Sequence, residues 1–220
     1  MKTLSVLGCF CLYVASGHLI DAQETSPATH DNSSISPDKQ WTYKCIEYGA
    51  GSCAPEIVKS DTTQVVLDLD KELDVNGPES GEARIIWAPD SKRFGFNYSP
   101  PHAHHTTYKT VAFYQLEADK WVGLSSPEEE LVKLAKGLLP KKGHENNDEL
   151  IPDIVKVSSW TDAITAILFS AWHPWQYDRE SNRLEAAFLL TLKFKDNGDW
   201  KMVKKHRMSK SEIEKFDSEQ

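Results

Sequence analysis

The chain has 220 residues, of which 40% are hydrophobic and 26% are charged, and its 25 Lys and Arg against 33 Asp and Glu give a net charge of −8. This balance is typical of a globular protein and excludes a disordered or fibrous chain. The negative charge argues against general nucleic-acid binding, which needs a basic surface. No apolar run reaches the roughly 18 residues that a membrane-spanning helix needs, so we expect no transmembrane span.

Residues 1–22 match the pattern of a secretory signal peptide. Lys2 supplies the positive charge, residues 4–15 (LSVLGCFCLYVA) form a short apolar run, and Ala22 offers a small residue for cleavage. A run similar to a lipobox ends at Cys9, but only eight residues precede it, which argues against a lipid anchor. We therefore expect a secreted or periplasmic protein, with a polar, disordered tether over residues 23–40.

Two cysteines, Cys45 and Cys53, remain after such a cleavage, and Gly49, Gly51 and Ser52 lie between them. In an oxidising compartment this pair predicts a disulfide that closes a small loop. The alternative is a redox-active or metal-binding pair, but the C-x-x-C spacing typical of those sites does not occur.

From Trp41 onward the hydrophobic period is mostly two, which predicts short β-strands. In the first part of the chain we expect strands at residues 64–69, 83–87, 93–98, 110–116 and 121–124. A helix that begins after Ser126 follows, because its apolar residues recur at i, i+3, i+4 and i+7. These residues are Leu131, Leu134, Ala135 and Leu138. Later strands are expected at residues 154–157, 163–172, 184–194 and 200–203, with a short C-terminal helix at 212–216.

The segments at about residues 64–125 and 152–205 are similar in the order of their elements. Each has a Trp, a turn, a strand, a long loop, a strand, a tight turn and a second Trp. The tryptophans are Trp87 and Trp121 in the first segment and Trp160 and Trp200 in the second. This order predicts a repeat, although strand-rich segments can also agree in this way by chance.

Residues 86–96 (IWAPDSKRFGF) form a recognisable motif in the first segment. The run resembles the W-S-P-D-G-K-x-I-A-F motif of TolB-like propeller repeats, in which the Pro-Asp-Gly turn joins the first two strands of a blade. Ala88 stands where that motif has Ser, and Ser91 stands where it has Gly. The wider chain is similar to small secreted bacterial proteins of unassigned function, which implies an envelope location and no particular chemistry.

Two repeats are too few to close a propeller, which typically needs four to eight blades. We therefore expect a mainly β fold in which two blade-like antiparallel β-meanders pack together, with one intervening α-helix and a short C-terminal helix. The alternative is a single, strongly bent sheet with the helix against it. In either case residues 41–220 form one β-rich domain.

The long loop between the second and third strands of each segment carries the candidate ligand-binding site. The candidate residues are His102, His104, His105 and Tyr108 from the first loop and Trp175 and Tyr177 from the second. If the two segments are equivalent, both loops leave the same edge of their sheets and bring these side chains together. Loops on a rigid β scaffold commonly carry binding residues.

The chemistry of these loops leaves alternatives open. Three histidines would suit a zinc, copper or nickel site, but the adjacent His104 and His105 would point to opposite faces of an extended strand. The aromatic residues of the second loop would suit stacking on a sugar or a peptide. Each group also has a purely structural interpretation, as a solvated loop for the histidines and as local packing for Trp175.

Catalytic motifs do not stand out in the sequence: we find no nucleophile elbow, zinc-binding helix or phosphate-binding glycine loop. The sequence therefore favours an exported, non-catalytic protein without a cofactor that binds a protein partner or a cell-wall glycan through the two loops. The first alternative is a secreted metal-binding protein or metal-dependent enzyme that uses residues 102–105. The second is a proteinaceous inhibitor of an exported hydrolase.

Overall fold

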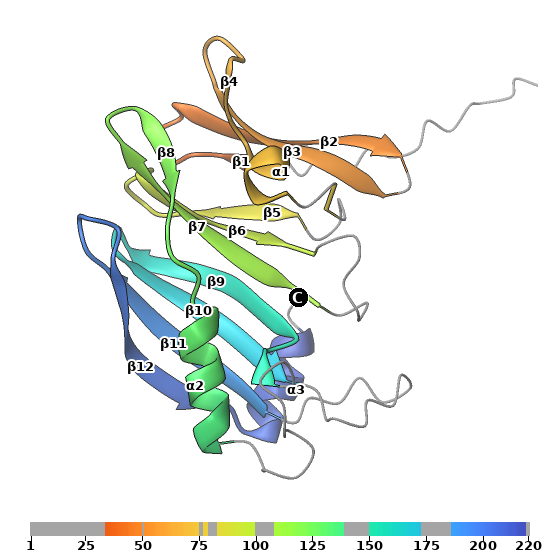
Figure 1. Ribbon diagram of the computed structural model, residues 1–220, viewed down its shortest axis with the longest axis vertical. Coiled ribbons are helices and arrows are strands. Elements are labelled where there is room, and N and C mark those ends of the chain that lie inside the picture. The colour runs from red at the N-terminus through yellow and green to blue at the C-terminus, as the bar shows by residue number, and fades with distance from the viewer. Residues whose placement is uncertain are drawn as a thin grey trace, which may run out of the picture.

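The computed structural model describes residues 34–49, 51–74, 77–78, 83–99, 108–138, 150–172 and 186–218. Within these residues the chain forms three four-stranded antiparallel sheets, which stack in chain order (Figure 1). The expected mainly β fold of four-stranded meanders is thereby confirmed. The strand expected at residues 64–69 is present, but it belongs to an additional N-terminal sheet and not to the middle sheet. The other strands of that first sheet were not predicted from the sequence.

The N-terminal sheet has the strand order β1-β2-β3-β4. Its strands are β1 (Ser34–Ile35), β2 (Trp41–Gly49), β3 (Ser52–Lys59) and β4 (Val65–Asp68). β1 lies inside the segment expected as a tether, so the folded part of the chain begins before Trp41. Alternate side chains of β2 and β3 are buried, among them Tyr43 and Ile57. A short helix, α1 (Leu69–Leu73), follows β4 and begins at Asp68, whose side chain accepts a hydrogen bond from the Lys71 amide.

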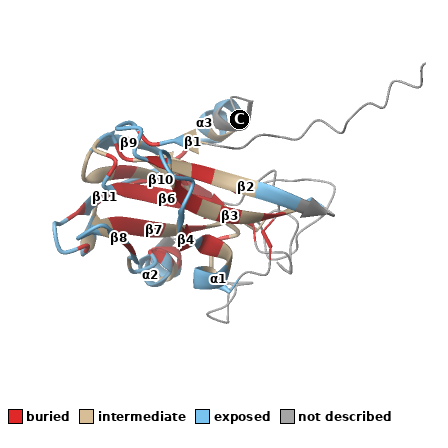
Figure 2. Cartoon of the chain, turned by 90° about the horizontal axis from the view of Figure 1, so that it is seen from above, coloured by how far each residue is buried: buried red, intermediate tan, exposed pale blue. Residues whose placement is uncertain are grey.

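The middle sheet has the strand order β5-β6-β7-β8. Its strands are β5 (Arg84–Trp87), β6 (Arg93–Tyr98), β7 (Thr110–Glu117) and β8 (Lys120–Gly123). β6 is buried on both faces (Figure 2): Phe94 and Phe96 pack against the N-terminal sheet, whereas Gly95 and Asn97 meet Val157 of the C-terminal sheet. A sheet with two covered faces has to lie inside a stack.

The C-terminal sheet has the strand order β12-β11-β10-β9. Its strands are β9 (Ile154–Asp162), β10 (Thr165–Trp172), β11 (Ala186–Phe194) and β12 (Trp200–Arg207). Helix α2 (Glu128–Leu138) packs into the same core as the face of this sheet that meets the middle sheet, and helix α3 (Lys210–Ser218) covers the opposite face. None of the described helices is long and apolar enough to cross a membrane.

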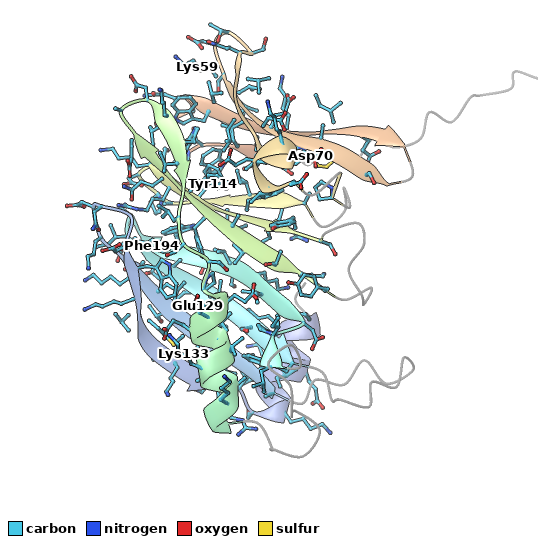
Figure 3. All side chains as sticks on the ribbon, in the orientation of Figure 1. Lys59, Asp70, Tyr114, Glu129, Lys133 and Phe194 are labelled. Atoms are coloured by element: carbon cyan, nitrogen blue, oxygen red, sulfur yellow. A yellow bond between two sulfur atoms is a disulfide. The ribbon has the colours of Figure 1, made fainter. Side chains whose placement is uncertain are left out.

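Aromatic rings form the contact between the N-terminal and middle sheets. Trp121 is at its centre, with ring centroids 5.6 Å from Trp41, 5.8 Å from Trp87 and 4.8 Å from Phe94. Tyr114, labelled in Figure 3, stacks on Phe94 with 5.0 Å between the ring centroids. Such aromatic pairs add about 0.5–1.5 kcal/mol each to the free energy of burial.

Directional hydrogen bonds cross the contact between the middle and C-terminal sheets. The side-chain amide of Asn97 donates to the carbonyl of Val157 (2.9 Å) and accepts from the amide of the same residue (2.8 Å). The guanidinium of Arg93 donates to the carbonyls of Ala163 and Lys195, each at 3.1 Å. Because these partners are fixed backbone groups, they set the position of one sheet on the other.

Gly95 allows the two sheets to approach closely. A Cβ atom at this position would lie 2.5 Å from Cγ2 of Val157. We expect Gly95→Ala to lower the free energy of unfolding by about 1–3 kcal/mol, the usual effect of overpacking a core. Urea denaturation followed by Trp fluorescence measures this change.

Gly137 in α2 supplies the matched control for Gly95. A Cβ atom there would contact nothing within 4 Å, so Gly137→Ala should stabilise the helix by about 0.5–1 kcal/mol. In the double variant Gly95→Ala/Val157→Ala, the loss should be smaller than the sum of the two single losses. Additive losses would contradict the proposed steric contact.

Asn97→Asp tests the amide link between the sheets. The new carboxylate keeps an acceptor for the Val157 amide but turns an oxygen toward the Val157 carbonyl, so we expect a loss of about 1–3 kcal/mol at neutral pH. Burial and this repulsion favour the protonated acid in the folded state, which raises its pKa above the unfolded value of about 3.9. The deficit relative to wild type should therefore shrink as the pH falls through the raised pKa.

Urea unfolding of wild type and Asn97→Asp at several pH values measures that difference. Gln64→Glu, at an exposed residue before β4, is the control and should cost less than about 1 kcal/mol because water screens its charge. A deficit for Asn97→Asp that is equally small, or that grows in acid, would argue against a buried amide link.

Candidate functional site

A groove of about 390 Å³ lies between the edge strands of the middle and C-terminal sheets. β5 is an outer strand of the middle sheet, and β9 is an outer strand of the C-terminal sheet. Both strands line the groove, together with the end of β6, the residue before β7 and one residue of β10. Its volume falls in the range of about 300–1,000 Å³ that is typical of small-ligand sites.

Cationic side chains from separate strands line this groove: Arg84 from β5, Lys109 before β7 and Lys156 from β9. Strand alternation explains two of these positions. Because Ile85 packs against the N-terminal sheet, its neighbour Arg84 points the other way. The neighbours of Lys156 are buried between the sheets, so Lys156 turns out of that core, and its Nζ lies 5.6 Å from the centre of the Phe169 ring.

Tyr98 lines the end of the groove. Its ring stacks on Phe96, with 5.1 Å between the centroids and 9° between the planes. Burial, and to a lesser extent Tyr108 and Glu128, raise the pKa of Tyr98 to about 12. The ring packs with the core between the N-terminal and middle sheets, and the phenol stays neutral well above pH 10.

Tyr108 is a predicted site residue that the structure describes. It is half-buried, and its carbonyl accepts a hydrogen bond from the hydroxyl of Ser99 (2.6 Å), which joins the two ends of segment 100–107. Burial raises the pKa of the Tyr108 hydroxyl, and the nearby carboxylates of Glu128 and Asp153 raise it further. The other predicted loop residues lie outside the described part of the chain: His102, His104, His105, Trp175 and Tyr177.

The strand ends that carry the two predicted loops meet at one end of the stack. Backbone hydrogen bonds run from the Lys109 amide to the Asp153 carbonyl and from the Val155 amide to the Lys109 carbonyl, each 2.8 Å long. They tie the start of β7 to the start of β9, which pairs with the end of β10. The described residues next to segments 100–107 and 173–185 therefore lie together, on the right of Figure 1.

The predicted disulfide is present. Cys45 and Cys53 are bonded, with their Cα atoms 5.3 Å apart, and the bond joins β2 to β3. Disulfides form and persist in oxidising compartments, and this one fits an extracellular or periplasmic protein.

Metal ligands do not gather in the described residues. No group of three or more His, Cys, Asp or Glu side chains able to hold a metal ion occurs in them. The histidine cluster of residues 102–105 lies outside those residues. Metal binding by these histidines therefore stays an alternative prediction from the sequence.

Sequence analysis did not single out Arg84, Lys109 or Lys156 as site residues. Arg84 and Lys156 are polar residues between apolar neighbours in a strand, a pattern that predicts only an outward-facing side chain. Their convergence depends on how two sheets pack, for which the local sequence carries no signal. In the sequence, these three residues are distinguished only by their positive charge, which is opposite in sign to the net charge of the chain.

Comparisons with known proteins give little guidance. No family model matches the chain, and no curated protein matches it. Among solved structures, a prolyl endopeptidase is similar over 79% of this chain, with 13% identity and a TM-score of 0.41. The match spans only 21% of that protein's length, and a likeness of this extent transfers neither a fold nor an activity.

Tyr98→Phe tests the burial of the Tyr98 side chain. In wild type, tyrosinate absorbance should lag behind that of the urea-unfolded chain as the pH rises past 10, because burial favours the neutral phenol. The variant should lack a component of absorbance that wild type gains only near pH 12. Spectrophotometric titration measures it, with circular dichroism to mark the onset of unfolding. A component lost near pH 10 would show that Tyr98 is solvated.

Proposed function

We propose that this chain is an exported, non-catalytic protein that binds a protein partner or a cell-wall glycan. Binding would take place at the end of the sheet stack where segments 100–107 and 173–185 leave the described strands. The observation that supports this proposal is the backbone contact at Lys109, which sets the starts of β7 and β9 side by side. A ligand at that end would be within reach of both loops.

Export is supported by two features that are independent of each other. The first is the signal-like pattern of residues 1–22, with its positive charge, short apolar run and small residues before the cleavage position. The second is the disulfide between Cys45 and Cys53. Together they favour secretion or a periplasmic location.

The strand order supports a repeat-based origin for the fold. In both the middle and the C-terminal sheets, the strands lie side by side in chain order, and the long connection follows the second strand. We therefore infer that residues 84–123 and 154–207 are copies of one unit, which resembles a TolB-like propeller blade. Equivalent copies would place their long loops at equivalent positions.

The loops start from strands that are held firmly, which favours recognition. β6 ends beside Asn97, whose amide is bonded to β9, and Ser99 closes the base of segment 100–107. Firm attachment limits the conformational entropy that a loop loses when it binds. The candidate contacts are His102, His104 and His105, with Tyr108, and the aromatic residues Trp175 and Tyr177. Aromatic rings supply large contact areas at a small entropy cost.

Fluorescence titration with soluble cell-wall fragments tests the glycan branch, and capture from periplasmic extract on the immobilised chain tests the protein branch. We expect a saturable change in Trp fluorescence or a specifically retained protein. Trp175→Ala should weaken that interaction by about tenfold or more, the effect typical of a truncated aromatic anchor.

Trp200→Phe is the matched control, because Trp200 lies opposite Phe194 in the register of β11 and β12, at the far end of the sheet from the loops. It removes one indole and should leave the affinity unchanged. The proposal fails if neither glycan fragments nor extract proteins bind. It also fails if Trp200→Phe weakens binding as much as Trp175→Ala does.

A further inference from the structure

We infer that the groove between β5 and β9 binds the carboxylate of an acidic sugar. This inference rests on the proposed binding function for the idea that the ligand is a glycan, but the groove has its own chemistry and can be tested separately. Three properties of the described residues support it: the charge of the lining, its apolar surfaces and the state of the strand edges beside it.

The charge of the groove opposes that of the chain. Arg84, Lys109 and Lys156 line it, and no Asp or Glu is among its described lining residues, whereas the whole chain carries a net charge of −8. A guanidinium presents a planar fork that matches a carboxylate, and ammonium groups add charge-assisted hydrogen bonds. A cleft lined by one sign of charge attracts the opposite ion.

The groove is also larger and less polar than a site for a bare ion needs to be. The ring of Phe169 lies beneath Lys156, and Ile86 and Ile154 contribute apolar surface. Tyr98 closes one end of the groove, while its ring stacks on Phe96. A carboxylate attached to a body with apolar C–H faces and hydroxyl groups, such as a uronic acid, fits this combination of surfaces.

The strand edges beside the groove argue against an acidic peptide. A peptide would bind an open sheet edge by adding a strand, which needs free backbone groups. On β9, the Val155 amide bonds Lys109, and both the amide and the carbonyl of Val157 bond Asn97. On β5, the carbonyl of Ile86 accepts from the indole of Trp160 (3.0 Å). With these four backbone groups occupied, side chains rather than an added strand supply the main contacts of the groove.

Isothermal titration of the full chain with D-glucuronate, D-glucose and inorganic phosphate tests this inference. We expect glucuronate to bind, glucose not to bind, and phosphate to bind more weakly than glucuronate because it leaves the apolar surfaces uncovered. Arg84→Gln and Lys156→Gln should each weaken glucuronate binding by about tenfold. Lys204→Gln removes the same charge from the exposed edge of β12 and should leave the affinity unchanged.

Lysine acetylation mapped by mass spectrometry gives a second measurement on the unmodified sequence. Glucuronate should protect Lys109 and Lys156 but not Lys204. The inference is overturned if glucuronate gives neither heat nor protection, or if Lys204→Gln weakens binding as much as the groove variants do. Phosphate or an oligoglutamate peptide that binds more tightly than glucuronate would overturn the assignment to a sugar.

The outcomes for the groove and for the proposed function are distinguishable. If glucuronate binds at the groove but neither cell-wall fragments nor extract proteins bind the chain, the groove assignment stands and the proposed function fails. If Trp175→Ala abolishes binding of a partner while Arg84→Gln and Lys156→Gln do not affect any ligand, the proposed function stands and the groove assignment fails.

Discussion

The hydrogen bonds that Asn97 and Arg93 make across the sheet interface determine the geometry of the rest of the fold. Apolar packing alone is tolerant of small shifts, whereas an amide that must both donate to and accept from Val157 has one satisfactory position. A buried polar group without its partner costs about 1–3 kcal/mol, so a shifted sheet is penalised at each of these residues. The groove and the meeting of the loop-bearing strand ends follow from that fixed register.

The two interfaces of the middle sheet differ in kind. On the C-terminal side, the indoles of Trp160 and Trp200 donate to the backbone carbonyls of Ile86 and Ser125. On the N-terminal side, the buried indole nitrogens of Trp41 and Trp121 have no hydrogen-bond partner among the described residues. The N-terminal sheet is thus held by ring packing, the hydrogen bond from Tyr43 to Ala83 and a few polar contacts at its edge. Within that sheet, the disulfide restrains the β2–β3 hairpin.

Hydrophobic periodicity and capping residues predicted the strands and helices that depend mainly on residues close in the sequence. The β6 expectation at 93–98 matches the structure, and α2 begins after Ser126, whose hydroxyl accepts from the Glu128 amide (3.3 Å) as an N-terminal cap does. Of the N-terminal sheet only β4 was predicted, at residues 64–69. β2 and β3 escaped prediction because Pro55 lies inside β3 and Gly49 and Gly51 flank the β2–β3 turn, features that normally argue against a strand. The groove escaped prediction because its cations come from separate strands, and only packing between sheets brings them together.

The same hydrogen bonds that align the sheets also protect their edges. An open strand edge invites pairing with another chain, and proteins usually block it with charges, short strands or covering segments. Here β5 is four residues long, and three backbone groups of β9 are occupied: the Val155 amide is bonded to Lys109, and the amide and carbonyl of Val157 are bonded to Asn97. A stack of antiparallel sheets can in this way limit strand addition at its edges. The surface left between the two edges is then defined by side chains, and its chemistry is that of Arg84, Lys109 and Lys156 rather than that of the peptide backbone.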